Sequence, residues 1–318
     1  MSNGTVSLLA MGGTVAAALD EGGAAPRHGA GDLAGTVSGL PVAVRPRDVC
    51  TVPSRAVTLD DMWTLAAAVR EEIEGGAAGV VVTHGTDTLE ETVYALAMLV
   101  DTDVPVVVTG AMRAPHLPGA DGPANIRAAI GAALHPPLAG YGPVVVFQDE
   151  IHVARLVTKH HSTRVAAFAS PSAGPVGFLV ENEVELLLGP PPVTDRLPVT
   201  AAPDRRVEIV PAMAGADGRL VDAIAAEVDA LVVAATGAGH LPPPLADALV
   251  RVVRGDRPVV LASRCEDGPI LRRTYRGHGS ETQLLADGLL ASRTLSPLKA
   301  RLRLVFGLSA GLTARQLF

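Results

Sequence analysis

The chain contains few lysines, few cysteines and few aromatic residues. Of its 26 basic residues only Lys159 and Lys299 are lysines, and the net charge is −7. Because no dense run of basic residues occurs, we expect neither a nucleic acid nor an anionic membrane surface as a partner. The only cysteines, Cys50 and Cys265, are far apart in the sequence, so the pattern indicates neither a disulfide framework nor a thiolate metal cage.

Long apolar runs are also missing. No stretch of about 18 uninterrupted apolar residues suggests a membrane span. The N-terminal sequence MSNGTVSLLAMGGTV has no charged leader and is broken by Gly12 and Gly13, which is a poor signal peptide. We therefore expect a cytoplasmic protein. With 318 residues, 48% of them hydrophobic and 19% charged, the chain is not wholly disordered and has ample material for a packed core.

Short β-branched runs alternate with stretches of helical period. Strands are expected at residues 6–9, 79–83, 104–109 and 144–147, and helices at 60–73 and 88–100. This alternation predicts a parallel sheet with helices on both faces. The sequence TLEE at residues 88–91 predicts a capping box at the start of the second helix.

A proline-rich stretch, GPPPVTDRLPVTAAPDRR, interrupts the alternation from Gly189 onward, as expected of a linker. Beyond it the pattern resumes, with strands expected at 207–211, 230–235 and 258–262 and helices at 220–228, 244–254 and 298–306. We expect a two-domain α/β fold, with a larger, flavodoxin-like N-terminal domain at 1–188, a linker at 189–205 and a smaller C-terminal α/β domain at 206–318.

Three loops follow the expected strands of the first domain: MGGTV at 11–15, THGTDT at 83–88 and TGAMR at 109–113. In open α/β sheets such loops carry the ligand site. Thr14 and Thr86 each place a hydroxyl just after glycine. A threonine hydroxyl is a weak nucleophile that needs a base, and Lys159 is the candidate base, with Asp87 beside Thr86.

Each motif taken alone has a simpler interpretation. The GGT loop lacks the full G-x-G-x-x-G spacing and a P-loop lysine, so a tight turn is favoured over nucleotide binding. Thr86 and Asp87 are also typical of a helix cap. His160 and His161 are adjacent and have no carboxylate at ligand spacing, so we expect a solvated turn and no metal.

Taken together, the segments resemble the bacterial-type L-asparaginases over nearly the whole chain. The segments are LLAMGGTVA, VVVTHGTDTLEETVYAL, VVVTGAMRAP with GADGPANIRAA, VTKHHSTRVAAFASPSAGPVGF and, near the end, LSPLKARLRL. The resemblance implies hydrolysis of L-asparagine to L-aspartate and ammonia through an acyl-threonine intermediate, without a cofactor. Thr14 matches the nucleophile, and Thr86, Asp87 and Lys159 match a group in which the lysine accepts a proton from a threonine hydroxyl.

The resemblance also implies substrate-binding positions. Ser54 and Arg55 fall where the family usually has Ser-Gln against the substrate carboxylate. Arg55 is a departure that either adds a bidentate contact or fills space. The main chain at Ala111 matches a contact to the side-chain amide, and backbone N–H groups near Thr14 and Thr86 are candidate oxyanion donors.

A homotetramer of intimate homodimers is implied, with each site completed by a neighbour's small domain. Glu281 matches the carboxylate that holds the substrate α-amine, and a surface glutamate is the alternative. His240 stands where the family often has asparagine. Lys299 lies in a helix-like segment, where a structural role is the default.

A larger departure lies in the segment after Thr14. The family commonly supplies a lid tyrosine there, but no tyrosine occurs between Thr14 and Tyr94. Residues 20–31, DEGGAAPRHGAG, are typical of a flexible lid, and whether Arg27 or His28 replaces the phenol stays open. Glutamine, D-asparagine or a larger biosynthetic amide is therefore an alternative substrate, and a non-catalytic amino-acid-binding protein is a further alternative.

Overall fold

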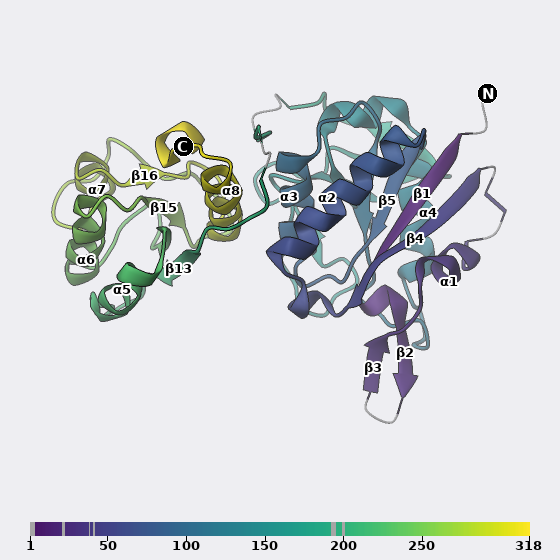
Figure 1. Ribbon diagram of the computed structural model, residues 1–318, viewed down its shortest axis with the longest axis horizontal. Coiled ribbons are helices and arrows are strands. Elements are labelled where there is room, and N and C mark those ends of the chain that lie inside the picture. The colour runs from purple at the N-terminus through teal and green to yellow at the C-terminus, as the bar shows by residue number, and fades with distance from the viewer. Residues whose placement is uncertain (1–3, 21–22, 38, 41, 192–194, 199–200) are drawn as a thin grey trace. The chain divides into compact units, whose positions relative to one another are not determined.

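The computed structural model describes the whole chain except residues 1–3, 21–22, 38, 41, 192–194 and 199–200 (Figure 1). The contacts divide the chain into two compact units, Met1–Arg196 and Leu197–Phe318. We call them the large unit and the small unit and describe each by itself.

The large unit is built on an eight-stranded sheet in the order β12-β11-β8-β7-β6-β5-β1-β4. Its first five strands in this sheet by chain order are β1 Thr5–Gly12, β4 Ala43–Val52, β5 Gly79–Thr83, β6 Val106–Thr109 and β7 Val144–Phe147. These five run parallel, and their spatial order is 2-1-3-4-5. That is the flavodoxin-like order, so the expected fold class is confirmed.

Helices cover both faces of this sheet, as the alternating pattern predicted (Figure 1). The helices are α1 Ala30–Gly35, α2 Leu59–Glu74, α3 Leu89–Leu99 and α4 Gly122–Ala133. Along β1 the side chains alternate: Val6 and Leu8 join the core cluster that contains Leu33 of α1 and Ile126 of α4. Ser7 points to the other face, where its hydroxyl donates to Glu72 of α2 at 2.6 Å.

The remaining three strands run antiparallel, so the expectation of a purely parallel sheet is wrong at one edge. These strands are β8 Glu150–Val153, β11 Gly177–Val180 and β12 Glu183–Leu186. Gln148 and Asp149, between β7 and β8, have φ values of 50° and 63°. Two successive residues with positive φ make a tight hairpin turn, which reverses the chain and leaves no room for a crossover helix.

The predicted capping box at the start of α3 does not form. Thr88 precedes the helix, but its side chain makes no capping hydrogen bond. Its hydroxyl instead donates to the carbonyl of Ser54 at 2.9 Å. A tertiary partner has replaced the local one, and it ties the start of α3 to the short helix η2 Ser54–Ala56.

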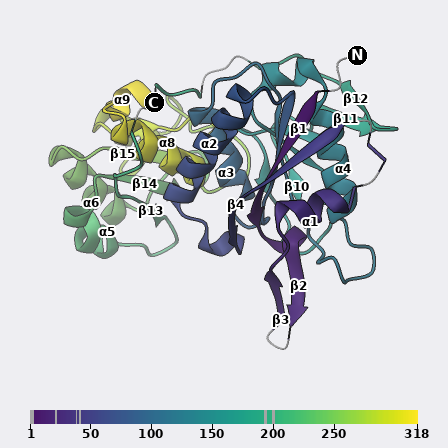
Figure 2. The same cartoon turned by 45° about the vertical axis from the view of Figure 1, so that its right-hand side comes forward.

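The segment expected to form a lid begins with a short helix and a hairpin. The helix η1 is Thr14–Ala16, and the hairpin strands are β2 Ala17–Asp20 and β3 Gly23–Pro26. Figures 1 and 2 both show this hairpin projecting from the body of the large unit. Its closure over a substrate stays a prediction. A second pair of short strands, β9 Thr158–Lys159 and β10 Phe168–Ala169, follows β8.

The small unit has a four-stranded parallel sheet in the order β13-β14-β15-β16. Its strands are β13 Val207–Pro211, β14 Ala230–Ala235, β15 Val259–Ser263 and β16 Leu290–Ala291. Its α-helices are α5 Arg219–Ile224, α6 Pro243–Arg254, α7 Glu281–Ala286, α8 Pro297–Ser309 and α9 Ala314–Leu317. Lys299 lies buried in α8, 2% exposed.

Candidate active site

Three loops of the large unit meet at the carboxyl ends of β1, β4 and β5. Gly13 has a φ of 81°, and a Cβ atom there would lie 2.3 Å from the Cα of Gly85. A Cβ atom on Gly85 would lie 2.7 Å from the Cβ of Ser54. Only glycine permits these close approaches. Because β1 and β5 are neighbours whose following helices α1 and α3 cover opposite faces, the loops diverge at the point where such sheets bind ligands.

A cavity of about 100 Å³ opens where these loops meet. Among its lining residues are four that the sequence singled out: Thr14, Ser54, Arg55 and Asp87. Pro26 of the β2–β3 hairpin also lines it, so the hairpin forms part of one wall. The cavity is smaller than the roughly 300–1,000 Å³ of pockets for drug-sized ligands, so it suits a small molecule.

Lys159 is held by the start of α3 at both of its ends. Its Nζ atom donates to Thr86 Oγ1 at 2.9 Å and to Asp87 Oδ1 at 2.7 Å. Its backbone N–H donates to Glu90 Oε1 at 3.2 Å. Glu90 is buried in the first turn of α3, and the sequence reasoning missed it. Its position four residues after Thr86, on the same helix face, was the only signal.

The carboxyl group of Asp87 is ionised at neutral pH. The hydrogen bond from Lys159 holds the pKa of Asp87 below its usual range, against the opposing effect of burial. The charge of Lys159, a bond from the Ser54 hydroxyl at 3.3 Å and the charge of Arg55 lower this pKa further. The carboxylate thus keeps the Lys159 ammonium group beside the Thr86 hydroxyl.

The two threonine hydroxyls have different partners. Because the Lys159 ammonium group donates to Thr86 Oγ1, the hydroxyl proton of Thr86 points elsewhere and is available to another acceptor. Thr14 lines the cavity, and among the described residues none hydrogen-bonds its hydroxyl. Thr86 is therefore equipped for proton transfer, and Thr14 is open to a ligand.

His84 supports the loop that carries Thr86. It is fully buried, and burial lowers the pKa of its imidazole to about 4, so the ring is neutral at pH 7. Its Nδ1 lies 2.7 Å from the carbonyl of Gly85, which can only accept, so Nδ1 carries the proton. Its Nε2 then accepts from the Thr92 hydroxyl at 3.0 Å. The sequence reasoning had no signal for this role.

Ala111 is buried in the turn that follows β6. It is not among the described residues that line the 100 Å³ cavity. Asn125 of α4 fixes the main chain before it, since its side-chain nitrogen donates to the Gly110 carbonyl at 2.9 Å. The structure therefore holds this turn firmly but does not by itself bring Ala111 into that cavity.

Glu281 and His240 form a pair within the small unit. Glu281 is fully buried at the start of α7, so the alternative of a surface glutamate is wrong. Burial by itself would raise the pKa of Glu281. The backbone N–H groups of Tyr275 and Thr274, which donate to Oε1 at 2.8 and 2.9 Å, and the nearby His240 hold it below its usual range.

The facing atoms of this pair are poorly satisfied. His240 Nε2 lies 3.3 Å from Glu281 Oε2, without the geometry of a hydrogen bond. Within the part of the chain that the structure describes, neither atom has another hydrogen-bond partner. An ionised carboxylate with a buried, unpartnered oxygen has the chemistry to accept a hydrogen bond from an ammonium group.

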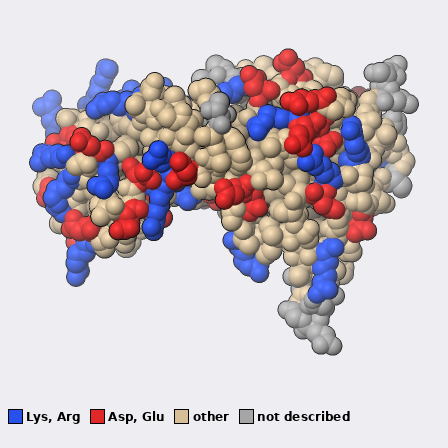
Figure 3. Space-filling model, in the orientation of Figure 1, with Lys and Arg blue, Asp and Glu red and all other residues tan. Residues whose placement is uncertain are grey.

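Two further findings concern the described residues only. They contain no group of three or more histidine, cysteine, aspartate or glutamate side chains placed to hold a metal ion. None of their helices is long and apolar enough to cross a membrane. Acidic and basic side chains are intermixed over the face seen in Figure 3.

Comparisons with known proteins cover both units. Residues 5–191 match the family model "Asparaginase, N-terminal", and residues 206–317 match "Glutaminase/Asparaginase C-terminal domain". A "Probable L-asparaginase" of Deinococcus radiodurans is 40% identical over 85% of this chain and 83% of its own length. One polypeptide of the glutamyl-tRNA(Gln) amidotransferase of Halobacterium salinarum is 30% identical over 96% of this chain and 75% of its own length.

A solved structure is similar over almost the entire chain. The crystal structure of a "Probable Cytoplasmic L-asparaginase" from Campylobacter jejuni has a TM-score of 0.88 and 27% sequence identity. The match covers 99% of this chain and 98% of that one. The similarity therefore extends over both units.

Proposed function

Since the chain belongs to the asparaginase family and is an amidohydrolase, we propose that it converts L-asparagine to L-aspartate and ammonia through an acyl-threonine intermediate. The observation that supports this most is the contact of Lys159 with Thr86 and Asp87, since Asp87 lines the same cavity as Thr14. A nucleophile that is open to a ligand and a separate proton-transfer group are the parts that amide hydrolysis needs.

In the proposed reaction, Thr14 Oγ1 attacks the side-chain amide carbon, the carbon–nitrogen bond breaks and ammonia leaves. Water then attacks the resulting ester and releases aspartate, which restores the Thr14 hydroxyl. In each half one proton leaves the attacking oxygen and one reaches the leaving atom. We assign both transfers to Lys159 acting through the Thr86 hydroxyl, so that the ammonium group is regenerated after each half. No cofactor is needed for these steps.

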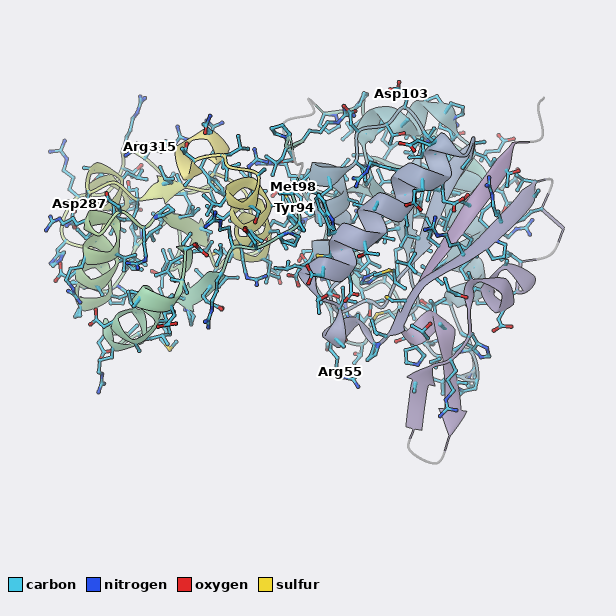
Figure 4. All side chains as sticks on the ribbon, in the orientation of Figure 1. Arg55, Tyr94, Met98, Asp103, Asp287 and Arg315 are labelled. Atoms are coloured by element: carbon cyan, nitrogen blue, oxygen red, sulfur yellow. The ribbon has the colours of Figure 1, made fainter. Side chains whose placement is uncertain are left out.

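Substrate binding is assigned to groups of both units. Ser54 and Arg55 would hold the substrate carboxylate, with the Arg55 guanidinium able to form a bidentate contact. Figure 4 shows the Arg55 side chain extending outward from the large unit. The main chain at Ala111 would contact the side-chain amide. Glu281 and His240 of a second copy would hold the substrate α-amine, for which the ionised, buried Glu281 carboxylate is suited.

This assignment requires an assembly, and we propose a homotetramer or an intimate homodimer with shared sites. We further propose a catalytic domain at 1–188, a linker at 189–205 and a C-terminal domain at 206–318. A cytoplasmic location is supported by the name of the similar Campylobacter jejuni protein.

A related amidase is the second candidate function. Its substrate would be glutamine, D-asparagine or a larger amide. The segment between Thr14 and Tyr94 contains no tyrosine, and Arg55 and His240 depart from the family's usual residues. The similarity to a glutamyl-tRNA(Gln) amidotransferase polypeptide shows that the relatives of this chain include proteins with other names. A non-catalytic binding protein is less well supported, because binding alone does not require Lys159.

The test is ammonia release by the purified protein from L-asparagine, L-glutamine, D-asparagine and a larger amide. We expect the highest kcat/KM for L-asparagine. Thr14→Ala should lower kcat by at least about 10³-fold, whereas Thr294→Ala, on the surface of the small unit, should leave it unchanged. Unchanged turnover in Thr14→Ala would exclude the acyl-threonine assignment, and tight binding of aspartate without turnover of any amide would favour the binding protein.

A further inference from the structure

Asp121 holds the far side of the turn that contains Ala111. It is the residue just before α4, and its side chain is buried, with the residue 5% exposed. Its two carboxylate oxygens accept the backbone N–H groups of Met112 at 3.0 Å and of Arg113 at 2.8 Å. The main chain that follows Ala111 is thereby fixed to the start of α4.

Asn125 holds the near side of the same turn. It is 1% exposed, and its side-chain nitrogen donates to the Gly110 carbonyl at 2.9 Å and to Asp121 Oδ2 at 3.1 Å. Its side-chain oxygen accepts the backbone N–H of Gln148 at 3.1 Å and the Gln148 amide at 3.3 Å. Both donor and both acceptor positions of the amide are therefore occupied.

No other side chain of this size can make these four bonds. Aspartate at position 125 would place an oxygen against the Gly110 carbonyl and the Asp121 carboxylate, where two donors now lie. A leucine there would leave the Gly110 carbonyl and the Gln148 N–H without partners, which is costly for buried groups. The chemistry of the site thus specifies an asparagine beside an aspartate.

We propose that Asp121 and Asn125 are positioning residues that set the main chain at Ala111 and thereby the length of amide side chain that the site accepts. The proposal rests on the proposed function, in which this main chain contacts the substrate amide. A displacement of about 1 Å at a positioning group costs on the order of 100-fold in rate. Glutamine places its amide one methylene further from the α-carbon than asparagine does, so a shift of the turn changes which amide it meets.

The test measures kcat/KM for L-asparagine and for L-glutamine in three variants, with the unfolding temperature of each. Asn125→Asp and Asp121→Asn each reverse the polarity of one buried contact while keeping the side-chain shape. We expect kcat/KM for L-asparagine to fall at least about tenfold, and the preference for asparagine over glutamine to fall by a similar factor. The control Gln148→Asn shortens only the amide on the side of Asn125 away from Ala111, and it should leave the preference within about twofold.

An unchanged preference in a folded Asn125→Asp or Asp121→Asn variant overturns the proposal, because a residue that merely stabilises the fold would lower both activities alike. Should Asn125→Asp not fold, the nearly isosteric Asp121→Asn decides. Failure of the proposed function gives a different result, since the unaltered protein would then release no ammonia from L-asparagine.

Discussion

The Nζ atom of Lys159 lies 2.9 Å from the hydroxyl oxygen of Thr86, although 73 positions separate the two residues in the sequence. The contact joins β9 to the loop after β5, and Asp87 binds the same nitrogen at 2.7 Å. At this separation a proton can pass between the lysine and the threonine without movement of the backbone. The geometry is therefore the one that general acid–base chemistry requires.

Removing the charge of Asp87 should impair the reaction without abolishing the fold. In Asp87→Asn the ion pair with Lys159 is lost, and we expect kcat to fall on the order of 10²-fold. Steady-state assays of ammonia release measure this. A kcat within twofold of the unaltered protein would contradict the role of Asp87.

The pH dependence of the same variant gives a second prediction. Since Lys159 lowers the pKa of Asp87, the carboxylate stays ionised as the pH falls, and the ion pair is lost only below the usual value of 3.8. A decline in activity between about pH 7 and pH 5 must then come from another group. The residual activity of Asp87→Asn should show the same acid limb in that range. An acid limb that disappears in the variant would contradict this.

Mixing two inactive variants tests whether the site is shared between copies. Thr14→Ala damages the large unit and Glu281→Ala damages the small unit. In a mixed dimer one site carries both changes and the other carries neither. Random exchange of protomers should therefore restore about a quarter of the unaltered activity.

Exchange is followed by native mass spectrometry, so that the fraction of mixed dimers is known. Mixing Thr14→Ala with Lys159→Met is the control, because both changes lie in the large unit and no intact site is regenerated. Mixed dimers without recovered activity would contradict the assignment of Glu281 to a neighbour's site.

Glu72 should stabilise the large unit in a pH-dependent manner. Burial alone would raise the pKa of Glu72, but bonds from Ser7 at 2.6 Å and from Arg47 at 3.1 Å hold it below its usual range. A lowered pKa contributes stability above the ordinary value of 4.5, and this contribution is lost as the pH falls through the lower value in the folded state. We expect Glu72→Gln to lower the free energy of unfolding by about 1–2 kcal/mol at pH 7.

Urea unfolding at pH 7 and at low pH checks this. The difference between Glu72→Gln and the unaltered protein should narrow as the pH falls below 4.5. Glu74→Gln, an exposed position on the same helix, should change the free energy of unfolding by less than about 0.5 kcal/mol. A difference that persists unchanged in acid would contradict the role of the Glu72 carboxylate.

The sequence predicted the parallel part of the fold well, because buried strands and amphipathic helices have distinct periods. Residues 79–83 and 144–147 were predicted as strands and form β5 and β7 with these bounds. The antiparallel edge was missed, because it depends on positive φ values at Gln148 and Asp149, which residue type does not announce. The capping box at Thr88 failed for a similar reason, since the Ser54 carbonyl is a partner distant in sequence.

The candidate site was predicted as a set of residues but not as a geometry. The motifs named Thr86, Asp87 and Lys159, and the structure brings these three together. Sequence reasoning did not find Glu90 and His84, because each acts through a backbone group whose position only the fold defines. Glu281 was named, but its burial beside His240 was not foreseen.

The most direct test of the account is kcat of the Lys159→Arg variant with L-asparagine. Arginine keeps the positive charge and the contact with Asp87, but it stays protonated and cannot exchange a proton with Thr86. Lys299→Arg, the same replacement at the chain's other lysine, should leave kcat per folded molecule unchanged. The account predicts that Lys159→Arg folds and loses about 10²–10⁴-fold in kcat. Full activity in that variant would contradict proton transfer by Lys159.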